Sequence, residues 1–130
     1  SQMHTSYSED PQTQKSREDH YVKMLQLMAE TGKLVRISEL DLGYEDRNGK
    51  TLKASELTDE QHRAMAGYYE FIVRKYLEIV PPDQQYGIAH WAPVDPKDDA
   101  WRGGEPVGLF DQNYNRKYAY AGFANGLMAY

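Results

Sequence analysis

The sequence predicts an α/β fold in which parallel strands alternate with helices. Residues 34–44 form a short apolar run that begins with β-branched residues, and a glycine lies near each end, which favours a buried strand over a helix. Residues 12–30 and 58–80, on either side of this run, carry apolar side chains at helical spacing. Because strands that alternate with helices are joined by crossover connections, we expect the strands to be parallel.

The chain begins with a strand and a first helix. We interpret residues 2–4 as the last residues of a strand and the polar residues 5–10 as a turn. Asp10 is followed by a proline, the pattern of an N-cap and a first helical position. The helix is expected over residues 12–30, with Gly32 as its C-cap.

The middle of the chain predicts a loop, a second helix and another strand. Residues 45–57 are charged and are interpreted as a surface loop. Thr58 and Gln61 have the spacing of a capping box, which marks the start of the helix over residues 58–80. Two prolines end this helix, and residues 86–91 are the next strand candidate.

The last third of the chain is a long segment followed by a helix. Residues 92–115 contain many breakers and acids, and because long loops in compact domains are usually functional or disordered, we favour an ordered functional loop. A last helix is expected over residues 116–127. Two and a half crossover units cannot close a barrel, which needs about 250 residues. The chain is therefore either a small open sheet or one part of a larger fold.

Composition excludes several classes of partner. The 130 residues have a formal net charge of −5 and a pI of about 5.3, which argue against nucleic acid and anionic membranes. No apolar run approaches the ~20 residues of a membrane span. There is no cysteine, which excludes disulfides and thiolate chemistry. Most of the eleven tyrosines are expected to fill interfaces between helices and sheet.

Two acids in the strand at residues 34–44 are candidate catalytic groups. Regular alternation places Val35, Ile37, Glu39 and Asp41 on one face of this strand. Parallel α/β folds place their chemistry at the carboxyl ends of strands. His4 ends the preceding strand, so a parallel neighbour would put its imidazole beside Glu39 and Asp41. The alternative for Glu39 is a surface carboxylate at a strand terminus.

Aromatic and histidine residues give further candidates. Trp91 and Trp101 lie after the last strand, where they could floor a sugar site or serve as a core residue and a loop anchor. His20, His62 and His90 show no metal-ligand spacing, and we expect the first two to be solvated. The sequence predicts neither a metal nor a cofactor.

The motifs resemble glycoside hydrolase family 10, the endo-β-1,4-xylanases. Ile-Ser-Glu-Leu-Asp at residues 37–41 resembles the nucleophile strand of that family, and residues 2–4 resemble the Gln-x-His that ends its sixth barrel strand. Residues 86–91 resemble the eighth strand. Residues 101–117 resemble the segment leading into the last helix. The resemblance extends in register from residue 2 to residue 127.

This resemblance implies the C-terminal part of a (β/α)8 TIM barrel, incomplete in this chain, with residues 1–130 as one portion of the catalytic domain. It implies that Glu39 is the nucleophile, that His4 hydrogen-bonds to it and that Asp41 orients His4. It also implies that Gln2, Trp91 and Trp101 line the substrate subsites.

The resemblance also implies that a second carboxyl group lies elsewhere. The family retains configuration, which requires two carboxyl groups about 5–5.5 Å apart. Its acid/base lies on the fourth strand, whereas this chain begins at the sixth. We therefore expect this chain alone to be inactive, with xylan as substrate and the missing N-terminal half as partner. The family implies a secreted or extracytoplasmic location.

Two other hypotheses remain open from the sequence. The chain could be a non-catalytic piece that binds xylan or has a structural role, because the acid/base is missing and two tryptophans are present. It could also be an unrelated small open α/β domain.

Overall fold

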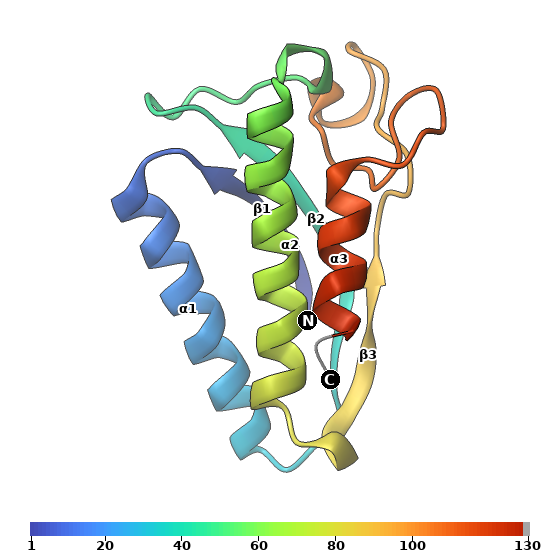
Figure 1. The fold of residues 1–130 in the computed structure, drawn as a ribbon. Coiled ribbons are helices and arrows are strands. Elements are labelled where there is room, and N and C mark those ends of the chain that lie inside the picture. The colour runs from blue at the N-terminus through green and yellow to red at the C-terminus, as the bar shows by residue number, and fades with distance from the viewer. Residues whose placement is uncertain (129–130) are drawn as a thin grey trace.

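The computed structural model describes residues 1–128, which form a parallel sheet of three strands covered on one face by three α-helices (Figure 1). The elements in chain order are β1 (Gln2–Ser8), α1 (Pro11–Glu30), β2 (Val35–Glu45), α2 (Asp59–Ile79), β3 (Gln85–His90) and α3 (Tyr118–Met128). Short 3-10 turns, η1 (Ala54–Glu56), η2 (Pro82–Gln84) and η3 (Trp101–Gly104), lie between them. The order β1-β2-β3 with parallel pairing confirms the predicted alternation.

Local signals in the sequence determine where the helices begin and end. The Asp10 carboxylate accepts the Thr13 N–H at 2.9 Å, with proline at the first helical position of α1. Gly32 follows the end of α1 with φ 69°, a left-handed conformation that glycine adopts without steric cost. Thr58 and Gln61 form the reciprocal capping box at the start of α2. Both predicted helix starts are confirmed.

Tyrosines fill the interface between the sheet and the helices. The Tyr76 hydroxyl donates to the Val35 carbonyl at 2.6 Å and accepts the Gly87 N–H at 3.0 Å, which joins β2 to β3. The Tyr21 hydroxyl donates to the Ile72 carbonyl at 2.8 Å, which joins α1 to α2. Each ring buries apolar area while its hydroxyl keeps a hydrogen bond, as buried phenols require. The predicted packing role of these tyrosines is confirmed.

The prediction that residues 5–10 form a turn is wrong for its first four residues. β1 continues to Ser8, and residues 5–8 pair with residues 42–45 of β2. Ser6 and Ser8 are buried, at 8% and 3% exposure. Short polar side chains fit this narrow interior, so a polar stretch here is compatible with a strand. His4 therefore lies in the middle of β1 and not at its end.

The prediction that Val35, Ile37, Glu39 and Asp41 share one face of β2 is also wrong, because the strand contains a bulge. The helix-covered face takes Val35, Ile37, Leu40, Leu42 and Tyr44, all at 2% exposure or less. In a regular strand Ile37 and Leu40 would point to opposite faces. β2 has one extra residue between them relative to β3, and such a bulge reverses the alternation. Glu39 and Asp41 consequently project from the face opposite the helices, whereas Val35 and Ile37 do not.

Among residues 1–128, no helix combines the length and the apolar character that crossing a membrane requires.

Candidate active site

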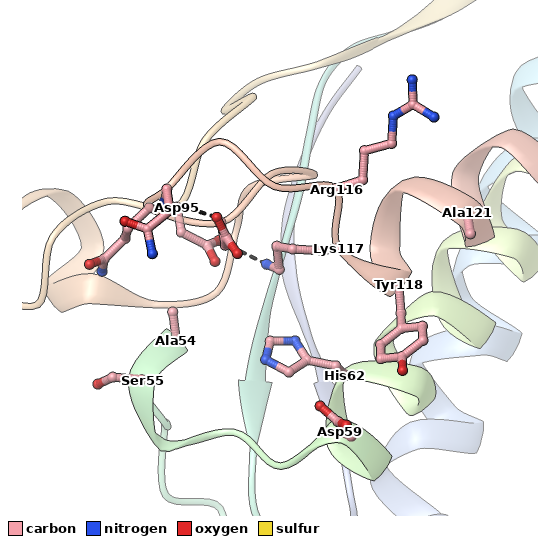
Figure 2. Close-up of a pocket in the computed structure, with 12 residues that line it drawn as sticks. Ala54, Ser55, Asp59, His62, Asp95, Arg116, Lys117, Tyr118 and Ala121 are labelled. Atoms are coloured by element: carbon pink, nitrogen blue, oxygen red, sulfur yellow. Dashed lines mark hydrogen bonds and ion pairs between the residues drawn. The ribbon is translucent and has the colours of Figure 1, made fainter.

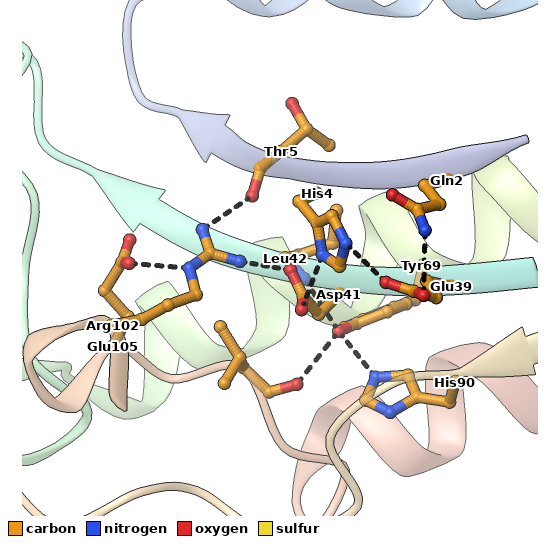
Figure 3. A network of polar contacts seen from close by, with 11 residues as sticks. Gln2, His4, Thr5, Glu39, Asp41, Leu42, Tyr69, His90, Arg102 and Glu105 are labelled. Carbon is orange, nitrogen blue, oxygen red and sulfur yellow. Dashed lines mark hydrogen bonds and ion pairs between the residues drawn. The ribbon is translucent and has the colours of Figure 1, made fainter. Parts of the chain in front are cut away.

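The register of β1 against β2 brings the predicted polar residues together. Gln2 is paired with Glu39, and His4 with Asp41. The Gln2 amide donates to Glu39 Oε1 at 2.9 Å, and His4 Nε2 lies 2.9 Å from Glu39 Oε2 (Figure 3). The other imidazole nitrogen, Nδ1, lies 2.9 Å from Asp41 Oδ2. Four side chains from two strands thus form one continuous hydrogen-bonded group.

Contact with two carboxylates determines the protonation of His4. An ionised carboxylate can only accept hydrogen bonds, so both ring nitrogens must carry a proton when Glu39 and Asp41 are both ionised. The hydrogen bond to Asp41 raises the pKa of His4; burial opposes this shift, and the bond to Glu39 adds to it. The geometry therefore favours an imidazolium between two anions.

Arg102 lies in this site, and sequence reasoning did not select it. Asp41 is fully buried, and its second oxygen, Oδ1, accepts a hydrogen bond from Arg102 Nη1. Arg102 Nε donates to Glu105 Oε2 at 2.9 Å. Arg102 lies 61 residues beyond Asp41, and no local pattern joins the two. Gly43 leaves the space for Glu105, because a Cβ at that glycine would collide with the Glu105 carboxylate.

The two tryptophans lie at the surface next to this network. Trp91 is 51% exposed and Trp101 is 47% exposed. The Trp91 ring meets the His4 ring edge-on, with 6.3 Å between centroids, and the Trp91 backbone N–H donates to the Leu40 carbonyl at 2.9 Å. The Trp101 ring lies 5.9 Å from the Arg102 guanidinium carbon. Exposed indoles beside buried polar groups are suited to stacking on the apolar faces of sugars.

Tyr69 and His90 form a second polar pair, which contacts the backbone of β2 from the helix side. The Tyr69 hydroxyl accepts the Leu42 N–H at 3.2 Å and lies 3.0 Å from His90 Nε2 (Figure 3). Burial lowers the pKa of His90 to about 4, so this imidazole is neutral near pH 7. Tyr69 can then donate to Nε2, which leaves the His90 proton on Nδ1. Within residues 1–128 that Nδ1 is buried without a hydrogen-bond partner.

A separate cavity of about 600 Å³ lies between the amino-terminal ends of α2 and α3 (Figure 2). Lys117 Nζ donates there to Asp95 Oδ1 at 2.8 Å and to the carbonyls of Pro106 and Gly108. Burial raises the pKa of Asp95 and lowers that of Lys117, and the ion pair opposes both shifts. All three Lys117 protons are occupied, so the pair has a structural role in the loop.

The histidine predictions have mixed outcomes. His20 is exposed, as expected. His62 lines the cavity of Figure 2 and is half-buried, so the prediction that it is solvated is wrong; burial lowers its pKa. Within residues 1–128, no group of three or more His, Asp or Glu side chains is arranged to hold a metal ion.

Comparison with known proteins identifies the family. The family described as glycosyl hydrolase family 10 matches residues 1–126, and the chain belongs to this family. A curated relative, Endo-beta-1,4-xylanase Xyn10C of Cellvibrio japonicus, is 32% identical over 115 residues, which cover 78% of this chain and 19% of the relative. The chain thus spans about a fifth of the length of that relative. The hypothesis of an unrelated small α/β domain is wrong.

Solved structures confirm the fold class. Native xylanase10C from Cellvibrio japonicus is 28% identical, with a TM-score of 0.70 over 86% of this chain and 26% of that chain. A variant of the same xylanase in complex with xylopentaose gives a TM-score of 0.69 at 28% identity, over 86% of this chain and 24% of that chain. A thermostable mutant of Xyn10A from Cellvibrio japonicus, at 22% identity, gives 0.72 over 96% of this chain and 38% of that chain. The chain is an α/β part of a (β/α)8 barrel, incomplete by itself.

Proposed function

We propose that this chain carries the nucleophile of a retaining endo-1,4-β-xylanase, which hydrolyses internal β-1,4-xylosidic bonds through a covalent glycosyl-enzyme intermediate. The observation that carries the proposal is the Glu39 carboxylate, of which each oxygen contacts a side chain of β1, Gln2 on one side and His4 on the other. Its side chain keeps 19% exposure, so the carboxylate is oriented and still reachable.

The environment of Glu39 suits both steps of such a reaction. In the first step the carboxylate attacks the anomeric carbon while a second carboxyl group protonates the leaving oxygen. In the second step water displaces Glu39, which must then leave as an anion. The imidazolium of His4 orients the carboxylate for the attack and stabilises it as the leaving anion of the second step, and Asp41 holds that imidazolium in place.

The exposed indoles support a sugar substrate. Trp91 is in contact with the ring of His4, and Trp101 lies on the loop that contacts Asp41 through Arg102. We propose that Trp91, Trp101 and Gln2 line the subsites next to the nucleophile. Xylopentaose in the complex of a related xylanase is a ligand of the same class.

We propose that the acid/base comes from an N-terminal part of the barrel. Other acids that could compete for the role are engaged elsewhere: Glu45 pairs with Arg17 at 2.9 Å, Asp95 with Lys117 at 2.8 Å, and Asp98 accepts from Ser55 at 3.1 Å. The chain would then require the remaining strands for turnover, in an enzyme that we expect to act outside the cytoplasm.

The test is xylan hydrolysis by this chain, alone and combined with the complementary N-terminal part of a family 10 barrel. We expect reducing sugar only from the combination. Glu39→Ala should abolish that activity, by about 10⁴-fold or more. Glu78→Ala is the matched control, because Glu78 pairs with Lys75 on α2, away from the network. Activity that survives Glu39→Ala rejects the proposal.

The exposed tryptophans also favour a second candidate, a non-catalytic piece that binds xylan. Affinity electrophoresis on soluble xylan separates the two. Retardation that Trp91→Ala abolishes, with no sugar released by the combined barrel, supports binding alone.

A further inference from the structure

The turn that carries Trp101 has an unusual backbone. Arg102, Gly103 and Gly104 have φ values of 54°, 61° and 79°. Glycine adopts this left-handed region without cost, but Arg102 has a Cβ and is strained there. Gly104 also requires its hydrogen, because a Cβ would collide with the backbone of Asp98. Interactions of the Arg102 side chain must therefore stabilise the turn.

Those interactions join three separate segments. The guanidinium donates to Asp41 on β2, to Glu105 at 2.9 Å in the loop, and to the Thr5 carbonyl on β1 at 3.5 Å (Figure 3). The Arg102 side chain is 20% exposed, and Asp41 is 0% exposed. A planar fork of donors fixes orientation as well as distance, which a single ammonium group does not.

Arg102 also extends the alternation of charge that begins at the nucleophile. Glu39, His4, Asp41 and Arg102 contact one another in that order, and with His4 protonated their charges alternate in sign. Among residues 1–128, each oxygen of Asp41 has one partner, His4 on Oδ2 and Arg102 on Oδ1. Without Arg102, the buried Asp41 carboxylate would lose half of its hydrogen bonds and be free to rotate away from His4.

We propose that Arg102 is a positioning residue that acts through Asp41, setting the Trp101 indole and the His4–Glu39 pair at a fixed distance from each other. The positions of the Trp101 indole and of the Glu39 carboxylate then both depend on the Asp41 carboxylate. The roles of Glu39 and Trp101 in this proposal rest on the proposed function. The link from Trp101 through Arg102 and Asp41 to His4 is a property of the folded chain. Fixed placement matters, because a shift of about 1 Å can reduce a rate by about 100-fold.

The test is nuclear magnetic resonance of the 130-residue chain, which observes the two indole N–H groups and the His4 side-chain nitrogens. Arg102→Met should move the Trp101 indole signal and alter the His4 signals. Asp41→Asn should also move the Trp101 signal, although no hydrogen bond joins these residues within residues 1–128. The matched control is Arg36→Met, since Arg36 stacks on Tyr86 at 5.6 Å and lies outside the network.

Wild-type positions for Trp101 and His4 in both Arg102→Met and Asp41→Asn would overturn the proposal. If Arg102→Met loses the dispersed spectrum of a folded chain, Glu105→Gln decides instead. It weakens one contact of the guanidinium and keeps the charge of Arg102, and it should shift Trp101; an unshifted signal rejects the link. Titration with xylotriose separates the two proposals. A linked Trp101 that does not respond to xylotriose contradicts only the proposed function.

Discussion

His4 Nε2 lies 2.9 Å from Glu39 Oε2, a contact between neighbouring strands. The parallel register places His4 opposite Asp41, two residues beyond Glu39, so one imidazole spans both carboxylates. That bridge resolves the repulsion that two acids on one strand face would otherwise have. It also makes the charge of His4 part of the stability of the fold.

The stability that His4 contributes should depend on pH. Its pKa is raised in the folded chain from an ordinary value of 6.5, so its contribution is complete below pH 6.5 and is lost as the pH rises through the folded pKa. We expect the difference in free energy of unfolding between wild type and His4→Gln to be largest under acidic conditions. Urea unfolding across this range measures it. A difference that is constant with pH contradicts the imidazolium.

His90 should have the opposite effect. Its pKa is lowered to about 4, so unfolding adds a proton at any pH between about 4 and 6.5, and stability should fall as the pH is lowered through that range. The full loss is at most about 3 kcal/mol. His90→Phe should reduce this acid sensitivity, whereas His20→Gln, at an exposed position, should not. Equal acid sensitivity of wild type and His90→Phe would show that His90 is not the cause.

Close packing of α3 on α2 should depend on Gly122. A Cβ there would collide with the backbone of Ala66, which cannot move as a flexible side chain does. We expect Gly122→Ala to lower the free energy of unfolding by about 1–3 kcal/mol. The control is Gly67→Ala on α2, where the added Cβ meets no atom of the described residues within 4 Å beyond its chain neighbours and its own helix backbone. That variant should be stabilised by about 0.5–1 kcal/mol. Equal thermal midpoints for the two variants would contradict the packing.

Breaking the Lys117–Asp95 pair should destabilise the loop before α3. Lys117→Met leaves the Asp95 carboxylate buried without its cation, which typically costs about 3–5 kcal/mol. Lys117→Met combined with Asp95→Asn should recover part of this loss, because the uncompensated charge is removed. Chemical denaturation of both variants measures the recovery. A double variant that is less stable than Lys117→Met would argue against a charge effect.

Local patterns in the sequence predicted most of the fold. They failed where contacts between segments far apart in the sequence determine the structure. The capping residues Asp10 and Thr58 depend on neighbours within three positions, so the helix starts could be predicted. The bulge in β2 could not, because the extra residue is defined only by pairing with β3. Contact of His4 with both acids followed from parallel pairing. Arg102 was missed because its partner Asp41 lies 61 residues away and its turn has no regular period.

The most direct test of the central claim is covalent trapping of the nucleophile. The chain, combined with the complementary N-terminal part of the barrel, is incubated with a 2-fluoro xylobioside that has an activated leaving group. The fluorine slows both steps, whereas the leaving group speeds only the first, so the covalent intermediate accumulates. Peptide mass spectrometry should find the sugar on Glu39, and Glu39→Gln should abolish labelling. Sugar attached to any other residue, or labelling that persists in Glu39→Gln, would contradict the account.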